Sequence, residues 1–413
     1  MSDNIGIISP ILSPISVFFV VFLEMFKKNS TFAEEYILLV MRILYITDAL
    51  AVWGGIERVL RDKANYLVEH YGYDVYIVTT DQGDHPIPYP LDERIHVHDL
   101  NIRYHRQYMY HGIKRVLKFW ELNHLFVCRL RDIIREIRPD ILVCIRLEEI
   151  RTIVKAKGGL PLICESHSMC YANHYENTSI FNRLRLFISR RYIRKADCIV
   201  ALTEGDANDW RHYNKNVRVI PNVVHLNDNG RFSALDSKIV IFAGRFTDQK
   251  DLWSLLKIWK LVHVRYPEWE LHVYGEGEHK QRFINESQRE NLNIKVFSPT
   301  SNIFDMYLDS SMLVMTSCYE PFGLVLPEAM SCGLPVIAFN CPYGPSEIIT
   351  DGVDGSLINN RDVNDFANHI CSLIENTTIR ETMGKSAIES SYRFRAERIM
   401  PLWDSLFSNL LKR

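Results

Sequence analysis

The chain has 413 residues, of which 47% are hydrophobic and 24% are charged, and its formal net charge is −2. This length predicts two domains with sizeable cores, and the nearly balanced charge argues against nucleic acid as the partner. The nine cysteines are odd in number and show neither a Cys-x-x-Cys pair nor the Cys/His spacing of a metal site, so we expect the reduced, buried side chains of a cytoplasmic protein.

The first 40 residues differ in character from the rest of the chain. Ile5–Phe26 is largely apolar, but Pro10, Pro14 and Glu24 interrupt it, and no small-residue cleavage site of a signal peptide comes after it. Met41 then opens a strand-like run. We therefore expect residues 1–40 to be an N-terminal extension upstream of the natural start, with a membrane-contacting segment as the alternative.

From Met41 onward, apolar strand-like runs alternate with helix-like segments. The runs are Arg42–Thr47, Val75–Thr79, Ile141–Ile145, Leu160–Cys164 and Cys198–Leu202. Such alternation predicts a parallel sheet with helices on both faces, and ligands of such sheets bind at the carboxyl ends of the strands. Gly54 and Gly55 follow the first run, so they can let a ligand approach the backbone; a plain turn is the alternative.

The run Cys164-Glu165-Ser166-His167 also ends a predicted strand. His167 could hydrogen-bond a hydroxyl group or a phosphate there, with Glu165 as the second candidate and an incidental histidine as the alternative.

Two stretches combine cations with apolar or aromatic residues. One is residues 103–120, and the other contains Arg183, Arg185, Arg190, Arg191, Arg194 and Lys195. Interfacial helices have this composition, and so do solvated helix faces.

A domain boundary is expected near Val217–Val224, where a strand-like run ends in Pro-Asn and a polar stretch follows. We predict domains over 41–221 and 222–390, followed by a terminal helix over 391–413. The second domain opens on Lys238–Ala243, after which Arg245 and Lys250 flank a strand-to-helix loop. Both cations suit phosphate oxygens, with ordinary surface cations as the alternative.

Two further loops come after strand-like runs of the second domain. Leu271–Tyr274 is followed by Gly275-Glu276-Gly277, which is a weak signal without a third glycine. Glu347 lies after the strand expected to begin at Val336 and is a candidate at that sheet edge.

The stretch Ser317–Phe339 is the most informative. A strand-like run leads into a turn containing Glu320 and Gly323, and a short helix begins at Leu324. Backbone N–H groups at Gly323 and Leu324 would favour an anion. Glu320 and Glu328, eight residues apart, would flank the same cleft and accept hydrogen bonds from hydroxyl groups; two exposed surface glutamates are the alternative.

From Met41 to the C-terminus, these motifs resemble the retaining, nucleotide-sugar-dependent glycosyltransferases of family 4, also called glycosyl transferases group 1, of the polysaccharide and lipopolysaccharide type. The resemblance rests on Gly-Gly-Ile-Glu-Arg-Val at 54–59, Gly-Arg followed by Lys250, Gly-Glu-Gly at 275–277 and Glu-x7-Glu. It implies an α/β protein of the GT-B fold, with two Rossmann-like domains whose parallel sheets face an interdomain cleft.

The resemblance also implies roles for individual residues. The catalytic candidates are Glu320 and His167. The donor-binding candidates are Gly55, Arg245, Lys250, Gly275, Gly323, Leu324 and Glu328, with Gly54, Glu165 and Glu347 as further candidates. Glu328 would hold the ribose, and Arg245 and Lys250 the diphosphate.

The implied activity is transfer of a hexosyl or N-acetylhexosaminyl unit, from a UDP-sugar in preference, to a saccharide or lipid-linked acceptor in cell-surface polysaccharide synthesis. No Asp-x-Asp motif in suitable surroundings occurs, so we expect no metal and no cofactor. We expect a cytoplasmic protein with peripheral contact at the inner face of the membrane. The alternatives are a GDP-mannose-dependent mannosyltransferase, a nucleotide-sugar epimerase, a glycogen phosphorylase or synthase type enzyme, and a non-enzymatic sugar-nucleotide-binding protein.

Overall fold

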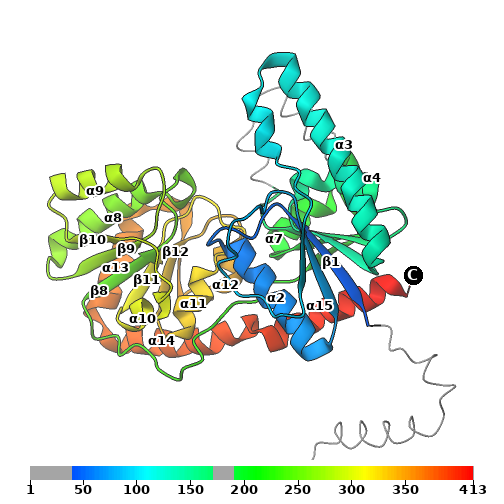
Figure 1. The fold of residues 1–413 in the computed structure, drawn as a ribbon. Helices are drawn as coiled ribbons and strands as arrows, with labels where there is room; N and C mark the ends of the chain where they lie inside the picture. Colours follow the sequence, from blue (N-terminus) through cyan, green and yellow to red (C-terminus); the bar gives the residue numbers. More distant parts are fainter. Residues whose placement is uncertain (1–39, 171–189, 413) are drawn as a thin grey trace, which may run out of the picture. The chain divides into compact units, whose positions relative to one another are not determined.

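The structure is a computed structural model that describes residues 40–170 and 190–412. It contains two parallel β-sheets, each flanked by helices (Figure 1). The fold class is confirmed: the chain is an α/β protein with two Rossmann-like domains. Residues 1–39 of the expected extension, as well as Arg183 and Arg185, lie outside the described residues.

The N-terminal sheet has seven strands in the order β3-β2-β1-β4-β5-β6-β7. Their bounds are β1 Arg42–Thr47, β2 Asp74–Thr79, β3 His96–Asp99, β4 Ile141–Cys144, β5 Leu162–Ser166, β6 Cys198–Ala201 and β7 Val217–Val219. β1 pairs in parallel with β2, with Arg42 opposite Asp74, and with β4, with Ile43 opposite Ile141. The strand order reverses at β1, so the carboxyl ends of β1 and β4 form the switch point where such sheets bind ligands.

The helices of the N-terminal half are α2 Gly55–Tyr71, α3 Gly112–Ile137, α4 Ile150–Ala156 and α7 Glu204–Arg211, with 3-10 turns at Tyr104–Met109 and Leu147–Glu149. Helix α2 buries Val59, Leu60 and Leu67 and ends at Gly72, whose φ of 66° is left-handed. Helix α3 buries residues only from Leu122 onward, and its first turns extend away from the sheet (Figure 1).

The C-terminal sheet has six strands in the order β10-β9-β8-β11-β12-β13, all paired in parallel. Their bounds are β8 Ile239–Ala243, β9 Glu270–Tyr274, β10 Ile294–Phe297, β11 Met312–Met315, β12 Val336–Phe339 and β13 Gly355–Ile358. The helices are α8 Leu252–Arg265, α9 Lys280–Arg289, α10 Ile303–Leu308, α11 Val325–Ser331, α12 Gly344–Ile348, α13 Val363–Glu375, α14 Thr377–Ser391 and α15 Ala396–Leu411, with 3-10 turns at Asp248–Lys250, Asn359–Arg361 and Tyr392–Phe394. Buried apolar side chains cover both faces of this sheet, with Trp259 and Phe366 in one cluster and Leu326 and Met330 in the other.

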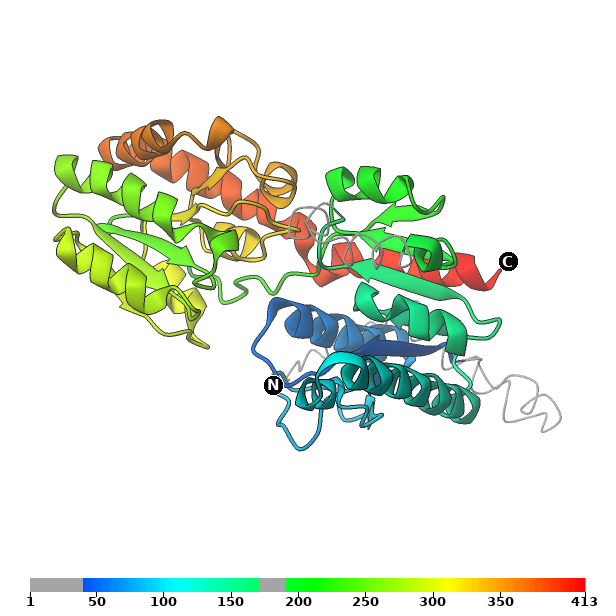
Figure 2. The same cartoon turned by 90° about the horizontal axis from the view of Figure 1, so that it is seen from above.

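Helix α15 packs against α2, which belongs to the N-terminal half (Figures 1 and 2). The Tyr73 hydroxyl, just beyond α2, donates a hydrogen bond to Asp404 of α15. Trp403 of α15 is 2% exposed, and its ring lies over the ammonium group of Lys63. The C-terminal helix is therefore part of the core that supports α2.

Candidate functional site

Glu328 lies in the first turn of α11 and is 2% exposed. Its carboxylate is paired with the guanidinium of Arg58 from α2, and the Tyr307 hydroxyl donates to its Oε2 at 3.5 Å. Sequence reasoning did not single out Arg58 as a functional residue. The signal that could have done so is its place in the Gly-Gly-Ile-Glu-Arg-Val motif, one helical turn after Gly54.

Two predicted glycines lie close to this pair. Gly54 caps α2 and Gly55 is its first residue. A Cβ on Gly55 would lie 3.0 Å from the Leu324 side chain, which directly precedes α11. Gly323 has a φ of 97°, so the turn before α11 requires a glycine. The structure therefore brings together Gly55, Leu324 and Glu328.

Glu320 and Lys250 form a second contact among the predicted residues. The Lys250 ammonium lies 2.6 Å from Oε2 of Glu320, and the Ser317 hydroxyl donates to the same oxygen at 3.0 Å. The side chains of Lys250 and Glu320 are 12% and 10% exposed. The Glu320 loop is held in place by backbone hydrogen bonds to the Pro342–Gly344 segment. A cation and a carboxylate thus share one partly buried position at the end of β11.

Arg245 is exposed and lies after β8 in a loop that packs on the Gly-Glu-Gly segment. A Cβ on Gly275 would lie only 1.9 Å from the Gly244 carbonyl oxygen, and the Phe246 N–H donates to the Glu276 carbonyl at 2.8 Å. Gly275 therefore allows a close approach of two backbone segments and so positions the Arg245 loop. The close packing of these two backbone segments is by itself a sufficient reason for a glycine at position 275.

His167 directly follows β5, and its Nε2 lies 3.0 Å from Oε2 of Glu165. Glu165 is also bound by the Lys63 ammonium and is 1% exposed. Burial alone would raise the pKa of Glu165, but Lys63 and His167 together lower it to about 2. Glu165 is therefore fully engaged by protein groups, whereas the other ring nitrogen of His167 is not used in this contact.

Glu347 makes a different contact from the other candidates. Its Oε1 accepts hydrogen bonds from the backbone N–H groups of Glu204 and Gly205 at 3.0 and 3.4 Å, at the start of α7. The nearby Tyr343 hydroxyl donates to Asp209 of α7 at 2.5 Å. In this arrangement Glu347 joins α12 to the N-terminal half.

A group of acidic residues that sequence reasoning missed lies at the carboxyl edge of the N-terminal sheet. Asp48 follows β1 and binds Arg146, which lies after β4, at 3.1 Å. Glu149 lies in the next turn, and its Oε2 is buried without a hydrogen-bond partner among the residues that the structure describes. Burial and the neighbouring carboxylates Asp48, Asp81 and Glu148 raise the pKa of Glu149 to about 8.

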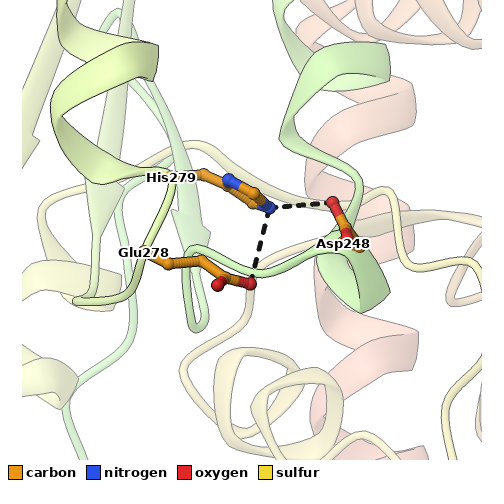
Figure 3. A group of neighbouring side chains, drawn as sticks. All are labelled: Asp248, Glu278 and His279. Atoms are coloured by element: carbon orange, nitrogen blue, oxygen red, sulfur yellow. Dashed lines mark hydrogen bonds and ion pairs between the residues drawn. The ribbon is translucent and has the colours of Figure 1, made fainter.

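One group of side chains has the spacing of metal ligands. His279 Nε2 lies 2.8 Å from Asp248 and 3.6 Å from Glu278 (Figure 3). The Asp248 and Glu278 side chains are 87% and 70% exposed. The imidazole Nε2 already contacts both carboxylates, and close contacts between exposed acidic groups and a histidine do not by themselves indicate a metal site.

Within the part of the chain that the structure describes, no helix is both long and apolar enough to cross a membrane.

Models of two protein families match this chain. The model for glycosyltransferase family 4 matches residues 53–228, and the model for glycosyl transferases group 1 matches residues 227–390. Together they cover residues 53–390, which include every predicted site residue from Gly54 to Glu347 and all described strands except β1.

Individual relatives agree with this family. The amylovoran biosynthesis glycosyltransferase AmsD of Erwinia amylovora is 28% identical over 382 residues, which are 89% of this chain and 99% of AmsD. The poly(ribitol-phosphate) alpha-N-acetylglucosaminyltransferase of Staphylococcus aureus is 27% identical, over 70% of this chain and 59% of its own length.

Solved structures show the same fold. A mutant of S. aureus TarM, in complex with Fondaparinux, alpha-GlcNAc-glycerol and UDP, is similar with a TM-score of 0.74 and 19% identity, over 89% of this chain and 99% of that chain. Anabaena HepE in complex with UDP has a TM-score of 0.70 and 19% identity, over 89% and 100% of the two chains. The two halves of the chain thus match two glycosyltransferase family models, and the chain is a glycosyltransferase with the GT-B fold.

Proposed function

We propose that this protein transfers a hexosyl or N-acetylhexosaminyl unit from a UDP-sugar to a saccharide or lipid-linked acceptor in cell-surface polysaccharide synthesis, with retention of configuration. The observation that supports the proposal is the contact of the Lys250 ammonium with Glu320, because a cation suited to a diphosphate and a carboxylate suited to a sugar hydroxyl share one partly buried position. AmsD is named for amylovoran biosynthesis, which supports a polysaccharide product. The HepE structure contains UDP, which supports a uridine nucleotide as the donor's nucleotide.

In this reaction the two cations act on the leaving diphosphate, and Glu328 acts on the ribose of the donor. The bond between the anomeric carbon and the β-phosphate oxygen breaks, and Arg245 and Lys250 stabilise the charge that develops on the diphosphate. The acceptor hydroxyl attacks from the same face, and its proton passes to the leaving phosphate. Glu328 accepts hydrogen bonds from the ribose, so Arg58 must share or release this carboxylate when the donor binds. No step requires a metal.

Site variants test the assignment. Lys250→Ala and Glu328→Ala are expected to abolish sugar transfer while the circular dichroism spectrum stays that of the wild type. Lys260→Ala and Glu290→Ala remove an exposed ion pair of the same half and serve as matched controls with unchanged activity. Full activity in either site variant would contradict the proposed donor site.

We also propose that the first turns of α3 contact an anionic membrane, where a lipid-linked acceptor would be found. Ile113, Val116, Leu117 and Trp120 recur at helical spacing and are 76%, 53%, 63% and 61% exposed. Lys114, Arg115 and Lys118 flank this face. Exposed apolar residues beside cations are typical of interfacial helices.

Vesicle sedimentation tests the membrane contact. The wild type should sediment with vesicles that contain anionic lipid, and Leu117→Glu should reduce the bound fraction. The control is Val264→Glu, which changes a 78% exposed apolar residue on α8. Equal binding by both variants would exclude α3 as the contact surface.

A further inference from the structure

A buried ion pair links the C-terminal helix to the predicted catalytic histidine. The Lys63 ammonium lies 2.5 Å from both carboxylate oxygens of Glu165, and the two side chains are 2% and 1% exposed. The Trp403 ring of α15 covers this ammonium at 4.1 Å from its centroid. A buried ion pair usually adds little stability compared with apolar side chains of the same size. Stability alone therefore does not explain this pair.

The pair has a defined effect on the imidazole of His167. That side chain is 5% exposed, and its Nε2 faces Glu165 at 3.0 Å. An ionised carboxylate can only accept hydrogen bonds, so a neutral His167 must carry its proton on Nε2. Nδ1 is then a hydrogen-bond acceptor. In the other neutral tautomer Nδ1 carries the proton, so it could donate a hydrogen bond but could not accept one.

We propose that Lys63 and Glu165 are positioning residues that hold His167 as the neutral Nε2–H tautomer, so that Nδ1 accepts a hydrogen bond from a substrate hydroxyl. This inference rests on the proposed function, because that function supplies the hydroxyl. The Lys63 ammonium contacts both oxygens of Glu165 and so fixes the carboxylate that faces Nε2. Trp403 stabilises the ammonium through its aromatic face, so α15 supports the histidine from outside the sheet.

Among the described residues, a second carboxylate also interacts with His167. Glu57 of α2 interacts electrostatically with the histidine, and it is 6% exposed. The guanidinium of Arg146 lies 3.5 Å from Glu57 and partly balances its charge. Glu165 therefore faces the cation of Lys63, and Glu57 faces Arg146, which Asp48 also contacts.

Nuclear magnetic resonance of protein labelled with 15N-histidine tests the tautomer directly and needs no substrate. The His167 signals can be assigned by their loss in His167→Asn. The wild type at pH 7.5 is expected to show the pattern of a neutral ring protonated at Nε2. Glu165→Gln should show a mixture of tautomers, because an amide can donate as well as accept. A wild-type ring that is protonated at Nδ1, or at both nitrogens, would overturn the inference.

Steady-state kinetics test whether the orientation of His167 by Glu165 and Lys63 matters for sugar transfer. Glu165→Gln and Lys63→Met should lower kcat by about 10–100-fold, the range found when the partner that orients a metal-bound histidine is removed, with a smaller change in KM for the donor. Tyr73→Phe is the control, since it removes a contact of the segment after α2 with α15 without touching Glu165. If Lys63→Met does not fold, the paired change Lys63→Met and Glu165→Met replaces it and should also have a low kcat.

The two proposals fail in different ways. An unchanged kcat in a folded Glu165→Gln variant of an active enzyme would contradict the positioning role. If the wild type shows the Nε2–H ring but transfers no sugar from any donor, the proposed function fails and the assignment of the imidazole stands.

Discussion

Glu149→Gln is expected to stabilise the protein at alkaline pH. The carboxyl group lies beyond β4, and its Oε2 is buried without a hydrogen-bond partner among the described residues. Burial is the main reason why the pKa of Glu149 rises from its ordinary value of 4.5 to about 8, and Asp48 and Asp81 add to the rise. The folded protein therefore keeps a proton on Glu149 at pH values where the unfolded chain has lost it.

The sign and size of the effect come from this difference. The folded state binds more protons between about pH 4.5 and 8, so the free energy of unfolding falls as the pH rises through this window. Each pKa unit corresponds to about 1.4 kcal/mol, which gives an upper limit of about 5 kcal/mol above pH 8. Water penetration and relaxation reduce such effects, and we expect about 1–3 kcal/mol to be measured.

Urea unfolding at pH 5 and pH 9 measures this difference. The variant should gain stability relative to the wild type at pH 9 and much less at pH 5. Glu136→Gln, at an exposed position on α3, is the control and should change little at either pH. An equal difference between Glu149→Gln and the wild type at both pH values would refute the assignment of a protonated Glu149.

Two further predictions concern buried contacts. Gly275→Ala should lower the free energy of unfolding by about 1–3 kcal/mol and weaken donor binding, because its Cβ would lie 1.9 Å from the Gly244 carbonyl oxygen. The control is Gly159→Ala, whose Cβ would have no atom within 4 Å. Equal urea midpoints of the two variants would count against the packing role of Gly275. The wild type should also lose stability as the pH falls from 4.5 towards about 2, because the pKa of Glu165 is lowered by Lys63 and His167. The double variant with methionine at positions 63 and 165 should lack this loss, and an identical acid profile of both proteins would contradict it.

The sequence was sufficient for most strands and for the central motif. Arg42–Thr47 is a strand over the predicted residues, and the runs Cys198–Leu202 and Leu271–Tyr274 match β6 and β9 to within one residue, because buried strands of parallel sheets are continuous apolar runs. The short strands β3 and β13 were not predicted. β3 has the sequence His-Val-His-Asp and is half exposed at the sheet edge, so it carries no apolar run.

The partners of the site residues could not be predicted in the same way. Lys63 lies 102 residues from Glu165, and Arg58 lies 270 residues from Glu328. No local spacing rule connects residues so far apart, since only the packing of α2 brings them together. The stretch 103–120 illustrates a similar limit, because a 3-10 turn and Gly112 divide what its composition suggested was one helix.

Nucleotide release from a panel of UDP- and GDP-sugars, with EDTA present and with or without a lipid-linked acceptor extract, tests the central claim most directly. We predict that one UDP-sugar releases UDP, that release depends on the acceptor, and that chelation does not reduce it. Isomerisation of a donor without acceptor would contradict the claim in favour of an epimerase. Loss of release on chelation would contradict metal independence, and donor binding without any turnover would contradict the proposed transfer.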